Sequence, residues 1–176
     1  MNIRKLLSAA AASVMAMSLL CSCGQSGVLR LGTGNTGGNY YSYGTLLHEL
    51  DENGIEVKKT AGSQANLRLM NEGFIDMAIV QSDVLSEAVN GVGDFENEPV
   101  SGVRAVAGLY DEAFQIVVRS KSDINSIADL KGKKISVGDE GSGVAKNAEY
   151  LLLSAGVAFS SCLLYTSPSP RDAHES

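Results

Sequence analysis

The chain has 176 residues and a formal net charge of −6 at pH 7. Residues 23–161 carry 11 basic and 18 acidic side chains, so a nucleic-acid partner is not expected, because a polyanion needs a clustered positive surface. Of the three cysteines, Cys21 falls in the leader and Cys162 in a divergent C-terminal segment, which leaves Cys23 and no disulfide framework, metal cluster or thiol nucleophile.

The first 22 residues predict an export signal. A short basic start precedes an uncharged run rich in Ala, Leu and Met, and cysteine then stands among small residues. The segment is similar to a bacterial lipoprotein signal, in which cleavage falls before a cysteine. Cys23 follows Ser22 and fits this pattern, whereas Cys21 follows the bulky Leu20. An ordinary secretory signal is the alternative, and a permanent span is disfavoured because serines interrupt the apolar run.

A glycine-rich loop follows the leader. Gly32, Gly34 and Gly37 form a complete G-x-G-x-x-G pattern, which binds an anion when a strand enters it and a helix leaves it. Residues 28–31 alternate like the end of a strand, and residues 40–50 repeat apolar side chains at helical spacing. We therefore expect the backbone N–H groups of this loop to face an anion.

Strands and helices then alternate along the chain. The predicted strands cover residues 55–61, 76–80, 103–110, 114–120 and 134–137, and the predicted helices cover residues 65–71, 84–90, a short turn before Gly132, and 145–155. Strands separated by single helices imply a parallel sheet with right-handed crossovers. The predicted fold class is therefore α/β.

Residues 162–176 differ in character from the rest of the chain. The stretch CLLYTSPSPRD is similar to the translation of a transposon-type sequencing adapter that ends some metagenomic reading frames. We therefore expect residues 162–176 to be a non-native tail, with the native sequence stopping near Ser161 inside a domain. A genuine Ser/Pro-rich tail, which would be disordered, is the alternative.

Four strand-to-helix junctions carry small polar residues, in the stretches GTGNTGG, AGSQAN, VQSD and GDEGSG. In a parallel α/β sheet such junctions face one crevice, into which helix N-termini direct N–H groups and positive dipole ends. For each of Thr36, Ser63, Ser82 and Ser142 alone, capping of the following helix is the alternative reading. Together the four junctions predict a site for a small polar ligand.

These motifs, in this order, closely resemble the TAXI-type solute receptors of TRAP transporters. The resemblance covers residues 29–157 and implies the two-lobe periplasmic-binding-protein fold of the second type. It also implies a receptor without enzymatic activity or cofactor, which captures a small organic acid or amino acid, glutamate-like, and presents it to a TRAP membrane permease. The family's last motif commonly reads G-S-G-T, whereas Val144 stands at the fourth place here, so a hydroxyl that would face the ligand is missing.

The resemblance also implies a set of ligand-binding residues from the four junctions. The glycines of the first loop would let the backbone approach a carboxylate rather than a pyrophosphate, and the following Tyr pair would line the cleft. The implied ligand-binding residues are Gly34, Asn35, Gly38, Tyr40, Tyr41, Ser63, Asn66, Gln81, Ser82, Ser142 and Gly143, and the implied lipidation site is Cys23.

The expected domain organisation follows from these patterns. The segments are a lipoprotein signal (1–22), a tether (23–28), the first lobe (29–112), the beginning of the second lobe (113–161) and the tail (162–176). The chain is expected to cross between the lobes near residues 113–118. The protein is expected outside the cytoplasm, held at the outer face of the cell membrane by lipid on Cys23 or free in the periplasm.

Other functions stay open. A dinucleotide-binding oxidoreductase would need an acidic residue at the end of the second strand, where the chain has Lys58 and Lys59, although lysines suit a 2′-phosphate. A hydrolase is disfavoured because His48 is predicted on the solvated side of its helix beside Glu49, with no activated Ser or Cys nearby. A surface lipoprotein with an adhesive or antigenic role would need no pocket.

Overall fold

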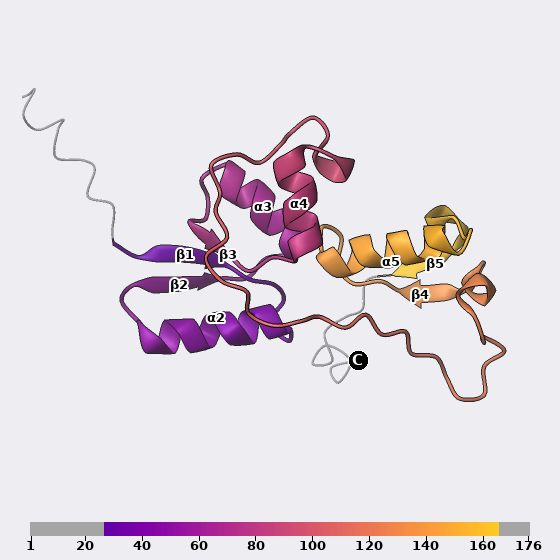
Figure 1. Ribbon diagram of the computed structural model, residues 1–176. Helices are drawn as coiled ribbons and strands as arrows, with labels where there is room; N and C mark the ends of the chain where they lie inside the picture. Colours follow the sequence, from indigo (N-terminus) through magenta and orange to yellow (C-terminus); the bar gives the residue numbers. More distant parts are fainter. Residues whose placement is uncertain (1–26, 166–176) are drawn as a thin grey trace, which may run out of the picture.

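The computed structural model describes residues 27–165, so the predicted export signal, Cys23 and residues 166–176 lie outside the described part. The described chain forms two parallel β-sheets, each packed against helices, and a long crossover connects them (Figure 1). The α/β fold class and the two lobes predicted from the sequence are confirmed. None of the helices in residues 27–165 combines the length and apolar character that a membrane span requires.

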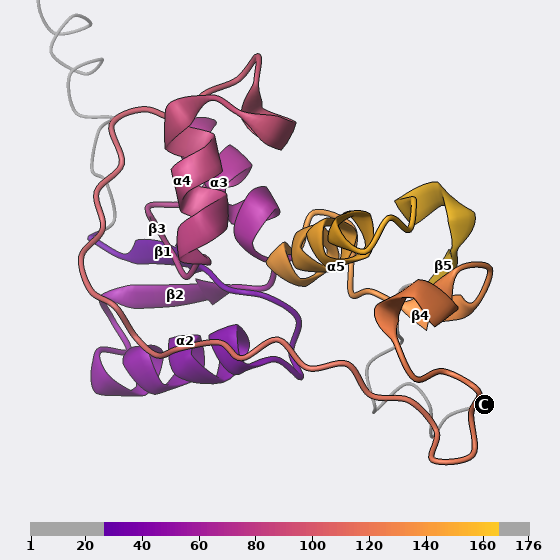
Figure 2. The same ribbon diagram turned by 45° about the vertical axis from the view of Figure 1, so that its right-hand side comes forward.

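The first lobe is built on a three-stranded parallel sheet in the order β2-β1-β3. Its elements in chain order are β1 (Leu29–Gly32), α2 (Asn39–Leu50), β2 (Ile55–Lys58), α3 (Ser63–Asn71), β3 (Met77–Ala78), α4 (Ser82–Asn90) and the 3-10 helix η1 (Gly93–Phe95). In the central strand β1, Leu29 lies opposite Ile55 and Leu31 lies opposite Met77. Helix α2 covers one face of the sheet, and α3 and α4 cover the other (Figure 2). This layering places three strand-to-helix junctions at one edge of the sheet.

An apolar cluster packs α3, α4 and η1 together. Its buried members are Leu67, Val84, Ala88, Phe95 and Val100. Helix α4 ends at Gly91, which adopts a φ of +63°, a left-handed conformation that favours glycine. The turn allows the chain to fold back so that Phe95 is only 1 % exposed. The helical layer on this face is therefore fixed by burial of a large aromatic side chain.

Helix α2 forms where predicted but packs on the sheet through a glycine. A Cβ atom at Gly44 would lie 2.6 Å from Thr33 Cγ2 and 3.3 Å from Val57 Cγ1, so only glycine allows this close approach. Apolar side chains that repeat along the helix face outward instead, with Leu46 55 % and Leu50 84 % exposed. Helical spacing identified the helix, but it did not identify the face that packs.

The two strands predicted at residues 103–110 and 114–120 are not formed. Both fall in the crossover, residues 101–126, which contains no helix or strand and runs between the lobes (Figures 1 and 2). Val106 is 90 % and Val117 87 % exposed. The apolar runs are typical of strands, but a strand needs a neighbouring strand to pair its backbone N–H and C=O groups. Within the described residues neither run has such a partner.

The second lobe contains a two-stranded parallel sheet covered by one long helix. Its elements in chain order are η2 (Ile127–Leu130), β4 (Lys134–Ser136), α5 (Gly143–Ser154), η3 (Phe159–Ser161) and β5 (Leu163–Tyr165). Helix η2 begins with a capping box in which the Ser126 and Asp129 side chains bond each other's backbone. Gly132 follows with a φ of +74°, which allows the turn into β4. The sequence predicted the end of a short helix at this glycine.

The end of the described chain packs into the second lobe. Cys162 is buried with Leu130, Leu152 and Val157, and β5 pairs with β4 from Lys134 opposite Leu163 onward. The non-native origin of residues 162–176 stays a prediction. In the structure, the first of these residues nevertheless contribute to a core and to a sheet.

Arg30 and Asp76 fasten β3 to β1, which pair over only two positions. Arg30 Nε lies 2.8 Å from Asp76 Oδ2, and a second guanidinium nitrogen lies 2.9 Å from Asp76 Oδ1. The backbone N–H of Arg30 also donates to Asp76 Oδ2, at 2.9 Å. The hydrogen bonds from the Arg30 side chain and backbone lower the pKa of Asp76 from 3.8 to about 2.

We expect Asp76→Asn to lower the free energy of unfolding by about 1 to 2 kcal/mol at neutral pH, the range for hydrogen bonds to a charged group at a partly exposed site. Because the folded-state pKa is depressed, this contribution is present above pH 3.8 and is lost as the pH falls towards 2. Urea unfolding at pH 7 and at pH 2.5 should therefore give a smaller difference at the lower pH. Glu72→Gln, at an exposed neighbouring position, is the control. If the loss of stability caused by Asp76→Asn is the same at both pH values, the role given to the Arg30–Asp76 pair is wrong.

Candidate functional site

The four predicted junctions come together where the two lobes meet. The carbonyl oxygen of Gly141, in the junction of the second lobe, accepts hydrogen bonds from the backbone N–H groups of Gln64 at 3.1 Å and Ala65 at 3.2 Å. The Asn35 side chain, in the first junction, donates to the Asp139 carboxylate. In the third junction, the side chain of Gln81 lies against Gly143 so closely that no Cβ atom would fit there. The convergence of the four junctions, predicted from the sequence, is thus found in the fold.

The N-terminus of α3 is already occupied. Its first free N–H groups, at Gln64 and Ala65, donate to the Gly141 carbonyl. A helix N-terminus attracts an anion through such N–H groups. In this arrangement the second lobe takes that place, so the expectation that all four helix N-termini face a ligand needs correction at α3.

Asn66 holds the first lobe together instead of facing a ligand. Its side chain is 0 % exposed, and Nδ2 donates to the carbonyl oxygens of Thr33 at 2.7 Å and Ile79 at 2.9 Å. These bonds join the ends of β1 and β3. The geometry gives no support to the ligand contact that the resemblance implied for Asn66, because both of its N–H groups are used inside the lobe.

Ser63 also has a structural role. It is the first residue of α3, whose N-cap is Gly62 with a φ of +121°, so Ser63 does not cap the helix. Its Oγ accepts a hydrogen bond from the backbone N–H of Gln81 at 3.0 Å, which ties the second junction to the third. Ser63 is 1 % exposed and is not among the residues that line the cavity described below.

Of the four residues considered as helix caps, only Ser142 caps. Its Oγ accepts from the backbone N–H of Ala145 at 3.1 Å at the start of α5. The N-caps of α2 and α4 are Gly38 and Gln81, without a side-chain cap bond, so Thr36 and Ser82 do not cap. Ser82 is exposed at the start of α4.

The Tyr pair divides between two sides of α2. Tyr40 interacts with the hydroxyl of Ser63 and with Glu112, and burial together with the Glu112 charge raises its pKa above the ordinary value. Tyr41 instead lines a separate hollow of about 580 Å³ on the outer side of α2 and β2, together with His48. The two tyrosines therefore do not line one cleft: Tyr41 lines this separate hollow, and neither ring is among the residues that line the larger cavity described below. Residue His48 is not simply solvated, because its Nδ1 lies 2.7 Å from the carbonyl oxygen of Ile55.

Two site residues were missed in the sequence because they lie in the crossover. Glu112 accepts hydrogen bonds from Gln81 Nε2 at 2.8 Å and from the Tyr110 hydroxyl at 3.1 Å. The Tyr110 ring stacks on Tyr43 of α2, with ring centres 5.0 Å apart and an angle of 13° between the planes. The sequence predicted Tyr110 as the last residue of a strand and Glu112 as part of the connection to the next strand. The path of the crossover along α2, which no local pattern encodes, brings them to the junctions.

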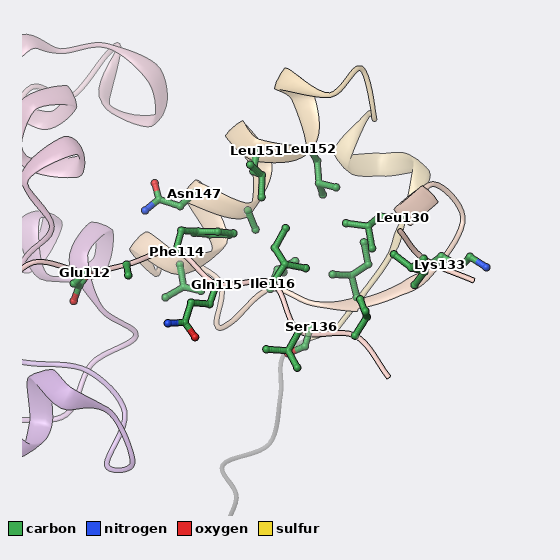
Figure 3. Close-up of a pocket in the computed structure, with 18 of the residues that line it drawn as sticks. Glu112, Phe114, Gln115, Ile116, Leu130, Lys133, Ser136, Asn147, Leu151 and Leu152 are labelled. Carbon is green, nitrogen blue, oxygen red and sulfur yellow. The ribbon is translucent and has the colours of Figure 1, made fainter. Parts of the chain in front are cut away.

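A cavity of about 1210 Å³ extends from this cluster into the second lobe. Its first-lobe end is polar and includes Asn39, Gln81, Tyr110 and Glu112. The other end is lined by apolar side chains, among them Ile116, Leu130, Leu151 and Leu152, which Figure 3 shows around the open space. Val144, at the place of the threonine that is common in TAXI-type receptors, also lines this cavity and makes its wall more apolar. Residues 27–165 hold no cluster of His, Cys, Asp and Glu that could bind a metal ion.

A model of the NMT1-like family matches residues 31–173, most of the chain. The chain belongs to the NMT1-like family. The match continues through most of the segment that the sequence suggested to be a non-native tail. Membership of the narrower TAXI type stays a prediction.

Two solved structures are similar to this NMT1-like chain. One is the alkanesulfonate-binding protein SsuA from Xanthomonas axonopodis pv. citri bound to MOPS, with 18 % identity, a TM-score of 0.45, and coverage of 84 % of this chain and 50 % of that one. The other is the periplasmic aliphatic sulphonate binding protein SsuA from Escherichia coli, with 21 % identity, a TM-score of 0.42, and coverage of 84 % and 49 %. The NMT1-like chain spans about half the length of these two proteins.

A buried lysine joins the two lobes of this NMT1-like protein. Lys146 of α5 is 7 % exposed, and its Nζ lies 2.9 Å from Asp94 Oδ2 and 3.9 Å from Glu87 Oε2 of the first lobe. The Tyr150 hydroxyl also donates to Glu87. Burial works to lower the pKa of Lys146, but the hydrogen bond to Asp94 and the two carboxylates outweigh it and raise the pKa. The ion pairs therefore join the two lobes, in addition to the hydrogen bonds to the Gly141 carbonyl.

We expect Asn66→Ala to destabilise the protein by about 1 to 3 kcal/mol, because it removes the side-chain donor of the Ile79 carbonyl oxygen and leaves the Thr33 carbonyl oxygen with only the Thr60 hydroxyl. Urea unfolding without ligand measures the loss. The control is Asn71→Ala, at the exposed end of the same helix, which should change stability by less than about 0.5 kcal/mol. Equal effects of the two substitutions would show that the Asn66 bonds carry no special weight.

Replacing Lys146 by Met should lower the free energy of unfolding by about 2 to 4 kcal/mol, because it leaves Asp94 and Glu87 side by side without their cation. The matched control is Lys133→Met, which removes an exposed ion pair with Asp123 and should cost less than about 1 kcal/mol. Hydrogen exchange should also speed up in α5 and η1 in the Lys146 variant. The interpretation is wrong if the two lysine substitutions have the same effect.

Proposed function

We propose that the protein is an extracytoplasmic solute receptor that binds a small carboxylate-bearing solute between its lobes and delivers it to a membrane permease of the TRAP type. The observation that carries this proposal is the meeting of four strand-to-helix junctions beside the polar end of the cavity. Small-molecule sites in open α/β folds lie at the carboxyl ends of strands, where helix N-termini and short polar loops meet. The predicted lipid on Cys23 would hold the receptor at the membrane.

The first junction offers the best place for the ligand's carboxylate. Helix α2 has 12 residues, and its N-cap Gly38 leaves the first N–H groups without a side-chain cap. Tyr40, in the first turn, adds a hydroxyl, and Asn39 lines the cavity beside it. N–H groups, a phenol and an amide can together hold a carboxylate without a buried cation. Gly34, Asn35 and Gly38 remain proposed binding residues in this loop.

The other junctions have a supporting part. Gln81 presents its amide to the cavity and to Glu112. Ser142 caps α5, and Gly143 leaves room for the Gln81 side chain, so these two residues shape the site from the second lobe. Ser82 stays a proposed contact only for a ligand that reaches beyond Gln81.

The proposal predicts binding without turnover. Calorimetry should be run against amino acids, dicarboxylates, an alkanesulfonate and NADPH, and at least one carboxylate should bind with a dissociation constant on the order of micromolar, about 8 kcal/mol. Tyr40→Phe should lower the affinity for that ligand by about 10- to 100-fold, which is the loss for one hydrogen bond to a charged group. Tyr41→Phe is the matched control. The Tyr41 ring lines the separate hollow beside His48, so the affinity of this variant for the ligand should stay unchanged.

The alternatives have distinct outcomes in the same panel. Binding of the sulfonate with none of the carboxylates would change the ligand class and leave a receptor. Binding of NADPH alone would favour an oxidoreductase. Equal effects of the two tyrosine substitutions would place the ligand away from the first junction.

A further inference from the structure

Two acidic residues, Asp111 and Glu112, line the cavity beside its polar end, and the Glu112 side chain is held in place by two neighbouring side chains. It belongs to the crossover, and Figure 3 shows it where the crossover leaves the first lobe. Gln81 Nε2 donates to Oε2 at 2.8 Å, and the Tyr110 hydroxyl donates to Oε1 at 3.1 Å. Each carboxylate oxygen accepts from one of these two donors, and a carboxylate oxygen has lone pairs for more than one partner.

The charge of Glu112 is not neutralised by these contacts. Both donors are uncharged, and among the ion pairs of residues 27–165 none includes Glu112. Basic side chains do line the cavity, but Figure 3 places Lys133 at the end away from Glu112, and Lys133 pairs with Asp123. A carboxylate that is oriented but not neutralised attracts a cation and repels a second anion.

Two tyrosines interact with this carboxylate. Tyr110 donates to Glu112 and stacks on Tyr43, and Tyr40 interacts with Glu112 from α2. The faces of aromatic rings carry negative partial charge and attract ammonium groups. A carboxylate beside tyrosine rings is thus a recognition arrangement for a positively charged nitrogen.

We propose that Glu112 binds an ammonium group of the solute, with Gln81 and Tyr110 as positioning residues. The inference rests on the proposed function only for the place of the solute in the cavity. It narrows the ligand class to amino acids or other zwitterions, whose carboxylate faces the first junction and whose ammonium faces the crossover. A dicarboxylate would bring a second negative charge towards Glu112 and should bind more weakly.

The test compares amino acids with acids that lack only the amino group. Calorimetry is run on the protein and on Glu112→Gln with three pairs: L-glutamate and glutarate, L-aspartate and succinate, L-leucine and 4-methylpentanoate. The protein should prefer the amino acid of the bound pair by about tenfold or more, the range for a hydrogen bond to a charged group. Glu112→Gln keeps the shape of the side chain: its oxygen can accept from Gln81 and its NH2 group can donate to the Tyr110 hydroxyl, so the variant should reduce this preference to about threefold or less. Glu98→Gln, at an exposed carboxylate outside the cavity lining, should leave the preference unchanged.

The outcomes separate this inference from the proposed function. If the amino acid and its deaminated partner bind equally, or if the preference survives in Glu112→Gln, the ammonium subsite is wrong and the carboxylate receptor stands. If amino-acid methyl esters bind and none of the acids does, the ammonium subsite stands and the carboxylate proposal fails. If none of these compounds binds, both are wrong. Equal melting temperatures of the three proteins without ligand show that the differences arise in binding.

Discussion

The docking of the Gly141 carbonyl on the N-terminus of α3 is the contact on which the arrangement of the two lobes depends. Two N–H groups that a helix leaves unpaired find their acceptor in the other lobe, so the junction loop of the second lobe is held at the edge of the first sheet. This contact brings Ser142 beside Gly62, where a Cβ atom would lie 3.4 Å from Ser142. The Asn35–Asp139 hydrogen bond and the Lys146 ion pairs are further contacts that agree with this position.

The sequence predicted the positions of the junctions better than the roles of their side chains. Glycine, serine and asparagine after short strands marked each strand-to-helix junction to within a few residues, because turn chemistry is local. Whether a polar residue of the first helical turn points into the lobe or into the cavity depends on how the helix is rotated against the sheet. Asn66 points inward and Tyr41 outward for this reason, and neighbouring residues of a helix point about 100° apart.

The crossover shows a second limit of local patterns. Its valine-rich runs resemble strands because valine favours an extended backbone. A strand also needs a partner strand for its backbone hydrogen bonds, and residues 27–165 supply none to either run. The extended path has a consequence for the site, because it carries Tyr110 and Glu112 along α2 to the junctions. The segment that was least well predicted therefore supplies a carboxylate at the polar end of the cavity.

The two charged groups between the lobes are treated in opposite ways. Lys146 is buried and has two carboxylates around it, so its charge is satisfied by the protein and serves to join the lobes. Glu112 accepts hydrogen bonds from uncharged donors, so its carboxylate is oriented but its negative charge is not neutralised. A buried charge with a full set of partners gains little from a ligand, whereas a partly exposed carboxylate without a cation gains from any ligand that brings one. This difference makes Glu112, and not the more deeply buried Lys146, the group that can select among solutes.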